Sequence, residues 1–349
     1  MRFRRIARGA ALPVIAALLL TAPAAGADDE ERELEIGRWY PSLESGLNLT
    51  QSAYSDNWNG GDKGSIVWTF ITNAGLESQL NEKTNWTNAL KLAYGQTHQQ
   101  NDDDEGERIW EKPEKSTDLI DFETVLRFTL GWVVDPYVSG RFESQFQDAS
   151  DPDGRSLPLN PLKFKESAGV ARKLIDEDER ELLTRVGFSL RQSLRDFYVN
   201  PAPDDATESE TTHDGGIEWV TDWKTKILED KVAWTSKLTL YQPLFYSDKP
   251  TFEDDLTAAQ IAAAGLPEDV ADYTTVVDVD WENIFTTQIT SYLSVNLYTR
   301  LLYDKYDNTV PPVLDDAGDL ENAEEVNAAI RKGGQFKQTL SLGLTYRFL

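Results

Sequence analysis

The chain has 349 residues, contains 0 cysteines and carries a formal net charge of −26 at pH 7. The lack of cysteine excludes a disulfide framework, a zinc–thiolate site and a cysteine nucleophile. The acidic balance argues against nucleic acid as a partner, because affinity for nucleic acid depends on Lys and Arg that neutralise phosphates.

The N-terminal segment has the pattern of a secretory signal peptide. Four arginines among the first eight residues precede the apolar run AALPVIAALLL, and small residues up to Ala27 precede the acidic stretch DDEERE. We expect residues 1–27 to be removed on export, which leaves a short periplasmic segment at 28–41 and a barrel domain at 42–349. The alternative is an uncleaved anchor helix, but the apolar run is shorter than the ~20 residues that a membrane span requires.

Twelve later segments alternate apolar and polar residues in steps of two. Alternation over ~10 residues is typical of strands in the wall of a membrane barrel. The sixth segment is the weakest, because Glu166 and Arg172 fall on its apolar side, and we expect a bulge or register shift there. The predicted strands are 42–53, 64–79, 83–97, 117–132, 136–147, 162–174, 181–197, 215–227, 231–243, 275–288, 291–304 and 334–349.

The connections between these segments alternate strictly between long and short. An outer-membrane barrel has this pattern, because its periplasmic turns are tight, its extracellular loops are long and its strand number is even. The alternative, a soluble β-sandwich, gives no reason for the alternation. We therefore predict an all-β, up-and-down antiparallel barrel of about twelve strands in the bacterial outer membrane. The long connections are 54–63, 98–116, 148–161, 198–214, 244–274 and 305–333.

The two faces of the predicted strands differ in character. One face is apolar and carries Trp and Tyr toward the strand ends, as expected for the aromatic girdles at the two lipid boundaries. The last strand ends with Tyr346 and Phe348. This ending resembles the terminal signal that bacterial barrels present to the barrel-assembly machinery, so we expect that machinery, outer-membrane lipid and lipopolysaccharide as partners.

The other face is crowded with charge. Basic residues concentrate on the fifth to ninth segments and acidic ones on the tenth, first, second and fourth, which predicts opposed walls of opposite charge across a lumen. Twelve strands lie between filled eight-stranded barrels and open sixteen-stranded porins, so a channel for small polar solutes and a polar filled core both stay open. The candidate lumen residues are Arg127, Arg141, Arg185, Arg191, Arg195, Lys224, Lys237, Arg300, Glu123, Glu143, Asp222, Asp278, Asp280 and Glu282.

The stretch LTQSAYSDNWNGGDKGSIVW, residues 49–68, resembles the start of an uncharacterised family of bacterial outer-membrane barrels, a domain of unknown function. Members carry an Asn-Trp-x-x-Gly-Gly element between their first two strands, and Asn57, Trp58, Gly60 and Gly61 match it. The resemblance implies a barrel, and no catalytic residues carry over from it.

The long connections are acidic and are read first as a solvated surface. Divalent cations at these loops are the alternative, with Asp151 and Asp153 as weak candidate ligands that lack the later glutamate of a calcium loop. Two connections, at 252–266 and 320–334, have the polarity of short helices.

Three functions remain open. The leading one is a passive channel for small polar solutes, and the alternative is a non-conducting surface or structural barrel that acts through its acidic loops. A lipid-modifying enzyme is the third, but the chain offers only His98 and His213 as a catalytic histidine, and no G-x-S-x-G occurs. We expect a protein that is not an enzyme and binds no organic cofactor.

Overall fold

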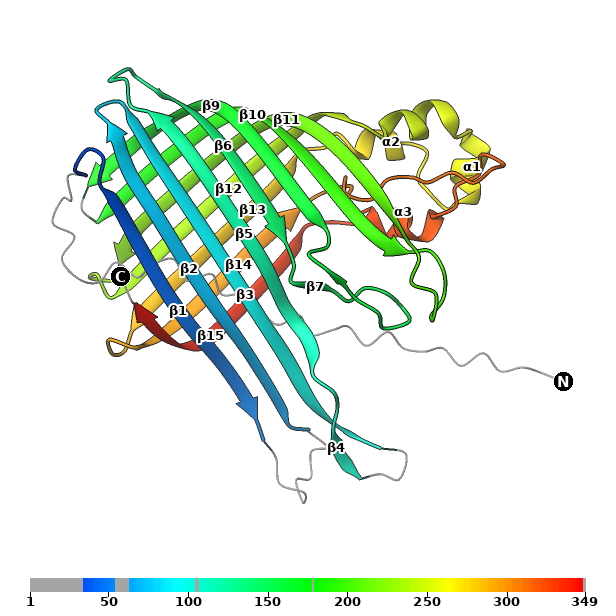
Figure 1. Cartoon of the computed structure of the whole chain (residues 1–349), viewed down its shortest axis with the longest axis horizontal. Helices are drawn as coiled ribbons and strands as arrows, with labels where there is room; N and C mark the ends of the chain where they lie inside the picture. The colour runs from blue at the N-terminus through cyan, green and yellow to red at the C-terminus, as the bar shows by residue number, and fades with distance from the viewer. Residues whose placement is uncertain (1–33, 54–62, 104–106, 178, 348–349) are drawn as a thin grey trace.

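The computed structural model describes residues 34–53, 63–103, 107–177 and 179–347. The predicted signal peptide, the element from Asn57 to Gly61 and the terminal Phe348 lie outside these residues. The described chain forms a closed antiparallel barrel of twelve strands, in which each strand pairs with its sequence neighbours and the last pairs with the first (Figure 1). The predicted fold is confirmed.

The strands of the barrel agree closely with the twelve predicted segments. They are β1 (Trp39–Ser52), β2 (Ser65–Asn81), β3 (Thr84–Asp102), β5 (Glu114–Phe128), β6 (Asp135–Ser144), β9 (Leu162–Glu177), β10 (Arg180–Tyr198), β11 (Thr207–Ile227), β12 (Val232–Tyr246), β13 (Asp278–Gln288), β14 (Leu293–Tyr303) and β15 (Gln335–Arg347). Three short strands lie in the long connections: β4 (Arg108–Trp110), which pairs with β3, and β7 (Gln147–Asp148), which pairs with β8 (Leu157–Pro158).

Strand β11 begins eight residues before the predicted position. Its first residues, TESETTHD, pair with the end of β10 up to Tyr198. This extension is polar on both faces, so it lacks the apolar alternation that marks a strand inside the lipid. The residue His213, predicted to lie in a loop, is therefore part of β11.

The irregularity predicted for the sixth segment is confirmed. Leu182 of β10 pairs with Ile175 of β9, and Leu183 pairs with Lys173, so Leu174 is the extra residue of a bulge. The bulge does not bury the two charged residues of this strand. Glu166 and Arg172 both remain exposed on the outer face of β9.

The connections after β12 and β14 fold together into a small helical unit, which we call the cap (residues 247–277 and 304–334; Figure 1, right). It contains the π-helix η1 (Thr251–Asp255) and the helices α1 (Ala258–Ala263), α2 (Val270–Tyr273) and α3 (Ala323–Ala329). Within the described ranges, no helix is long and apolar enough to cross a membrane.

The cap has a hydrophobic core of its own. Val270 and Val326 are fully buried in it, and Phe252 packs edge-on against the ring of Tyr306. Helix α1 starts with a capping box between Thr257 and Gln260. The predicted short helices are thus present, and they form one packed body rather than loose loops.

Candidate functional site

The candidate site is the inner face of the barrel, and burial identifies which side chains point there. On β11, Glu218 and Val220 are 4% and 3% exposed, whereas Ile217 and Trp219 are 43% and 50% exposed. Successive side chains of a strand point to opposite faces. Even-numbered residues of β11 therefore point inward, and the apolar odd-numbered ones form the outer face.

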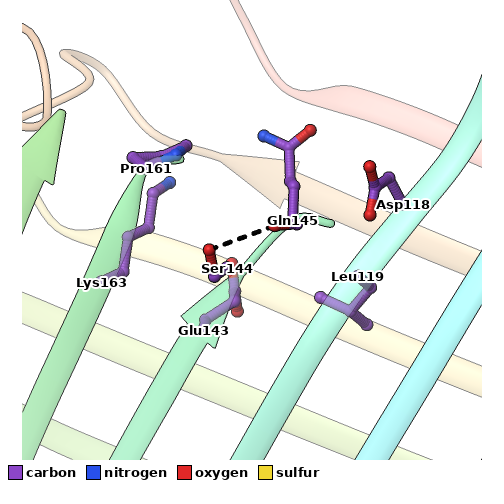
Figure 2. A pocket seen from close by; sticks show the side chains of 7 residues that line it. All are labelled: Asp118, Leu119, Glu143, Ser144, Gln145, Pro161 and Lys163. Carbon is purple, nitrogen blue, oxygen red and sulfur yellow. Dashed lines mark hydrogen bonds between the residues drawn. The ribbon is translucent and has the colours of Figure 1, made fainter. Parts of the chain in front are cut away.

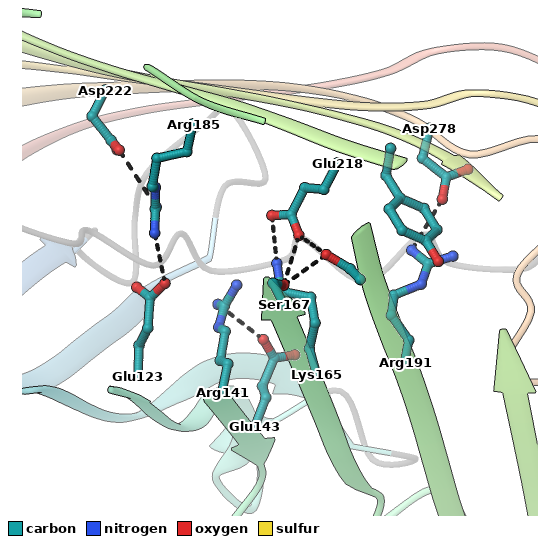
Figure 3. A network of polar contacts seen from close by, with 12 residues as sticks. Glu123, Arg141, Glu143, Lys165, Ser167, Arg185, Arg191, Glu218, Asp222 and Asp278 are labelled. Carbon is teal, nitrogen blue, oxygen red and sulfur yellow. Dashed lines mark hydrogen bonds and ion pairs between the residues drawn. The ribbon is translucent and has the colours of Figure 1, made fainter. Parts of the chain in front are cut away.

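Arginines on two strands are held by carboxylates inside the barrel (Figure 3). Arg141 on β6 donates from Nε to Asp121 Oδ1 at 2.7 Å and from Nη2 to Asp121 Oδ2 at 3.0 Å. The same Nη2 lies 3.2 Å from Glu143 Oε2. Arg185 on β10 lies 3.4 Å from Glu123 of β5 and 3.5 Å from Asp222 of β11. Since β6 and β9 separate β10 from β5, the Arg185–Glu123 pair spans the concave interior.

Glu218 is the centre of a second group. Lys165 Nζ of β9 donates to Glu218 Oε1 at 2.7 Å, and Ser189 Oγ of β10 donates to Oε2 at 2.6 Å. Ser167 completes the group through a 2.6 Å contact with the hydroxyl of Ser189. The carboxylate is buried, and these donors compensate for its lost hydration.

Arg191 connects three strands near the cap. It donates to Asp214 of β11 at 2.7 Å and to Asp278 of β13 at 3.1 Å. Its guanidinium lies 3.8 Å from the centroid of the Tyr241 ring, and the Tyr241 hydroxyl donates to Asp214 at 2.6 Å. Asn308 of the cap contacts the other oxygen of Asp214 at 3.5 Å. The interior network therefore reaches the cap directly.

Arg300 of β14 makes the same kind of contact on the far side of the barrel. It donates to both oxygens of Asp280 at 2.7 Å each and lies 3.3 Å from Glu282. The Tyr298 hydroxyl donates to Glu282 at 3.1 Å. Each of these arginines thus meets a carboxylate on a neighbouring or nearby strand.

The charges are interleaved rather than separated into opposed walls. The expectation of a transverse field across the lumen is therefore wrong for the charges in these pairs. The physical reason is reach: long side chains find partners one to three strands away, and pairing lowers the cost of holding charge in a confined space.

Four predicted lumen residues lie outside these groups. Lys224 is paired with Glu181 at 3.4 Å near a short turn. Arg195 is in register with Glu210, and Lys237 with both Asp222 and Glu282. Arg127 Nε is buried without a hydrogen-bond partner among the described residues.

The interior is accessible to water beside the charged groups. The side chains of Arg141 and Glu143 retain 32% and 39% of their exposure, and those of Arg300 and Asp280 retain 37% and 32%. A dry polar core would leave far less. Space for water-sized molecules therefore runs alongside the ion pairs.

One side of the interior is apolar, which the sequence did not reveal. Ile71 of β2 and Ala93 of β3 form a buried cluster with Ile284 of β13 and Tyr298 of β14, and Leu119 packs against it. These residues lie on the inward parity among polar neighbours. Each is isolated in its own strand, so no run of residues marks the cluster.

A polar recess opens where β6 ends and β9 begins (Figure 2). It holds about 170 Å³, and Glu143 lines it while also contacting Arg141. The recess therefore adjoins the interior network. The other lining residues are Asp118, Leu119, Ser144, Gln145, Pro161 and Lys163.

The acidic residues considered as metal ligands are engaged in other contacts. Asp151 accepts hydrogen bonds from Arg155 at 3.0 Å, and these bonds hold the pKa of Asp151 below its ordinary value. Asp153 accepts from the backbone N–H of Ala202 at 2.7 Å. Among the described residues, no three or more His, Asp or Glu side chains are grouped to hold a metal ion.

The two histidines lie on the outer parity of their strands. His98 follows the buried Thr97 on β3, and His213 shares the parity of Ile217 on β11. Four strands, β5, β6, β9 and β10, separate β3 from β11 on that side of the barrel.

Asp214 is a member of the network that sequence reasoning missed. It lies in the stretch ESETTHDGG, which has the composition of a loop. Its neighbour Gly216 packs against the backbone of Gln242, where a Cβ atom would lie 2.1 Å from the carbonyl oxygen. The glycine pair thus serves close strand packing on β11 rather than a turn.

Solved structures of outer-membrane barrels are similar to the chain in fold. The COG4313 outer membrane channel from Pseudomonas putida F1 is 11% identical, with a TM-score of 0.42 over 93% of this chain and 100% of that one. The translocator domain of the autotransporter NalP from Neisseria meningitidis is 9% identical, with a TM-score of 0.36 over 89% and 88%. A mutant of the Rh. blastica porin is 8% identical, with a TM-score of 0.23 over 89% and 100%.

Residues 49–149 match the sequence profile of a family described as a protein of unknown function, DUF3078. No curated protein matches the chain. The matched segment begins at Leu49, where the resemblance to an uncharacterised barrel family begins, and continues through β2, β3, β5 and β6.

Proposed function

We propose that the protein is a passive outer-membrane channel for small polar solutes, with a lumen lined by ion pairs. The observation that carries the proposal is the partial exposure of charged side chains inside the barrel, such as Glu143 at 39% and Arg300 at 37%. Water beside fixed, balanced charges offers a path for small hydrated solutes.

The same interior limits the size of the solute. Arg185 reaches Glu123 across two strands, and the apolar cluster around Tyr298 occupies the other side. These side chains take up part of the interior, so we expect ions and small polar molecules to pass and larger solutes to be excluded. Because acids and bases alternate along the path, we expect weak charge selectivity.

Aromatic side chains support a position in a lipid bilayer. The rings of Trp234 and Phe285 stack at 5.7 Å, and those of Tyr292 and Tyr346 stack at 6.1 Å beside a short turn. Such aromatic belts mark lipid boundaries. We infer that the protein is exported to the outer membrane and that residues 1–27 are removed. N-terminal sequencing of the protein extracted from membranes tests this, and a sequence that does not start near Asp28 would contradict it.

Single-channel recording in planar bilayers tests the channel. The refolded mature chain should give small, ohmic conductance steps, and a folded protein that gives none would overturn the proposal. Glu143→Gln removes a half-exposed inner charge and should shift the reversal potential in a salt gradient toward anion preference. Glu166→Gln is the matched control, because it removes the same charge from the outer face of a neighbouring strand and should leave the reversal potential unchanged.

A second function is favoured by the cap, which has a packed core instead of the loose loops of a simple pore. The cap provides a defined acidic surface for an external partner. A folded barrel that conducts no ions would leave this surface as the functional part of the molecule.

A further inference from the structure

The closure of the barrel between β1 and β15 is short. Among the residues that the structure describes, Glu44–Asn48 of β1 pair with Gly343–Arg347 of β15. Beyond Asn48, residues Leu49–Ser52 pair with β2 alone, and Gln335–Leu342 pair with β14 alone. The pairings that would continue the register, Leu49 with Leu342 and onward to Ser52 with Thr339, are not formed. Above the paired stretch the two strand edges are therefore not joined by ladder hydrogen bonds, and we call this unpaired stretch the lateral opening.

This opening lies within the part of the wall that faces the membrane. Tyr346 stacks on Tyr292 at a short turn and marks the periplasmic lipid boundary. Leu342 lies four residues farther along the strand, which is about 13 Å at ~3.3 Å per residue and about 10 Å in height for a strand tilted by ~40°. The apolar band of such a barrel is about 25 Å tall. The opening therefore begins near the middle of the band.

The outer rim of the opening is apolar. Leu49 is 53% exposed, and Leu340 and Phe336 are 68% and 67% exposed on the opposite edge. Directly below, a shallow groove lined by Leu47, Phe70, Leu344 and Tyr346 follows the paired part of the closure. An acyl chain lying along the wall would contact apolar surface up to the opening.

The inner side of the same edge is polar and has unused bonding capacity. Lys337, Thr339 and Ser341 point inward in a column on β15. Within the described ranges, Lys337 makes no ion pair, and the buried hydroxyl oxygens of Thr339 and Ser341 make no hydrogen bond. The nearest base, Arg300, is in register with Lys337 and is itself held by Asp280 and Glu282. The ammonium group of Lys337 fits an anionic head group.

We propose that the gap between Leu49–Ser52 of β1 and Gln335–Leu342 of β15 is a lateral binding site for amphiphiles with an acyl chain and an anionic head group, such as fatty acids. The head group lies inside the barrel against Lys337, and the chain passes between the strand edges into the lipid. The head group lies beside Arg300 of the channel lining, whereas the acyl chain lies outside the axial path.

Photolabelling tests the site in the intact barrel reconstituted in phosphatidylcholine vesicles. The probe is palmitate with a diazirine beside the carboxylate. We expect label on residues 337–341, located by peptide mass mapping. Label confined to outward residues, or to other strands, would overturn the proposal.

Lys337→Gln should reduce this label about tenfold, as expected for the loss of one charge-assisted hydrogen bond. Labelling by hexadecanol with the same diazirine should not change, and an equal loss for both probes would overturn the assignment of an anionic head.

Closing the gap gives a second arm. The chain has 0 native cysteines, so Leu49→Cys with Leu342→Cys can be bridged by a short bifunctional thiol reagent. Bridging should abolish the label on residues 337–341 and leave single-channel conductance unchanged, which separates this site from the channel. Leu47→Cys with Leu344→Cys, already paired in register, is the control and should keep the label.

Persistent label after bridging at Leu49 and Leu342 would overturn the proposal. So would a disulfide-linked dimer of the single variant Leu342→Cys, because a second copy would then cover the edge.

Discussion

The pairing of β10 with β11 and the pairing of β1 with β15 are the two extremes of the same wall. β10 pairs with β11 along all 19 of its residues, from Arg180 to Tyr198. Within the described part of the chain, the closure between β1 and β15 joins Glu44–Asn48 to Gly343–Arg347. The long pairing carries the interior ion pairs of Arg185 and Arg191. We infer that the region from β9 to β13 holds the barrel together and that the closure is the place where it can open.

The largest effect is expected for Glu218, at the centre of the well-paired region. Glu218→Ala leaves Lys165 as a buried charge without a partner, which costs about 3–5 kcal/mol. The midpoint of urea unfolding in lipid vesicles measures it. The double variant Lys165→Met with Glu218→Met should recover most of the loss, since apolar replacement of a whole buried pair is often nearly neutral. An unchanged midpoint for Glu218→Ala would show that this pair does not stabilise the wall.

The cap should respond independently of the barrel. Leu266 is buried in the core of the cap, and Leu266→Ala should lower the free energy of cap opening by about 2–4 kcal/mol. Hydrogen exchange of residues 250–330 would report this loss, while the exchange of β9 to β11 stays as it is. Equal acceleration in both regions would mean that the cap and barrel unfold as one unit.

A pH dependence of the cap is expected from Asp304, at the junction of β14 and the cap. Burial and the neighbouring Asp278 and Asp307 raise the pKa of Asp304 to about 8. A carboxyl group with a raised pKa stabilises the folded state fully below its unfolded pKa, near 4, and this contribution is lost as the pH rises through about 8. Protease resistance of the cap should therefore fall between pH 5 and pH 9, and Asp304→Asn should remove most of that fall. A cap equally resistant at both values would contradict the raised pKa.

The smallest effect is expected on the outer face. Glu166 is exposed there, in register with Gly140 and Leu190. Glu166→Leu should stabilise the barrel in lipid by about 1 kcal/mol, because it replaces a charged carboxylate on the lipid face with an apolar side chain. The gain is small because carboxylates are disfavoured there less strongly than lysine or arginine. Lys165→Leu, one position away on the inner face, should destabilise. If both variants shift the unfolding midpoint in the same direction, the assignment of faces on β9 is wrong.

The strands could be predicted because lipid imposes a period of two on each of them separately. The bulge at Leu174 lies beyond Glu166 and Arg172 and leaves both on the outer face, so these two residues did not mark its position. The partners inside the barrel could not be predicted. Lys165 meets Glu218 across β10, and such a contact depends on the registers of two pairings at once. The length of the closure and the cluster around Tyr298 depend in the same way on how distant strands meet.

The most direct test of a water-filled, ion-paired interior is a nitroxide scan of β12, residues 234–241, in bilayers. Labels on the outward positions, such as Leu238 and Leu240, should collide with dissolved oxygen in the lipid. Labels on the inward positions, such as Lys237 and Thr239, should collide with a small water-soluble nickel chelate. Inward labels that neither reagent reaches would show that the interior is a dry core, and the proposed channel would then be wrong.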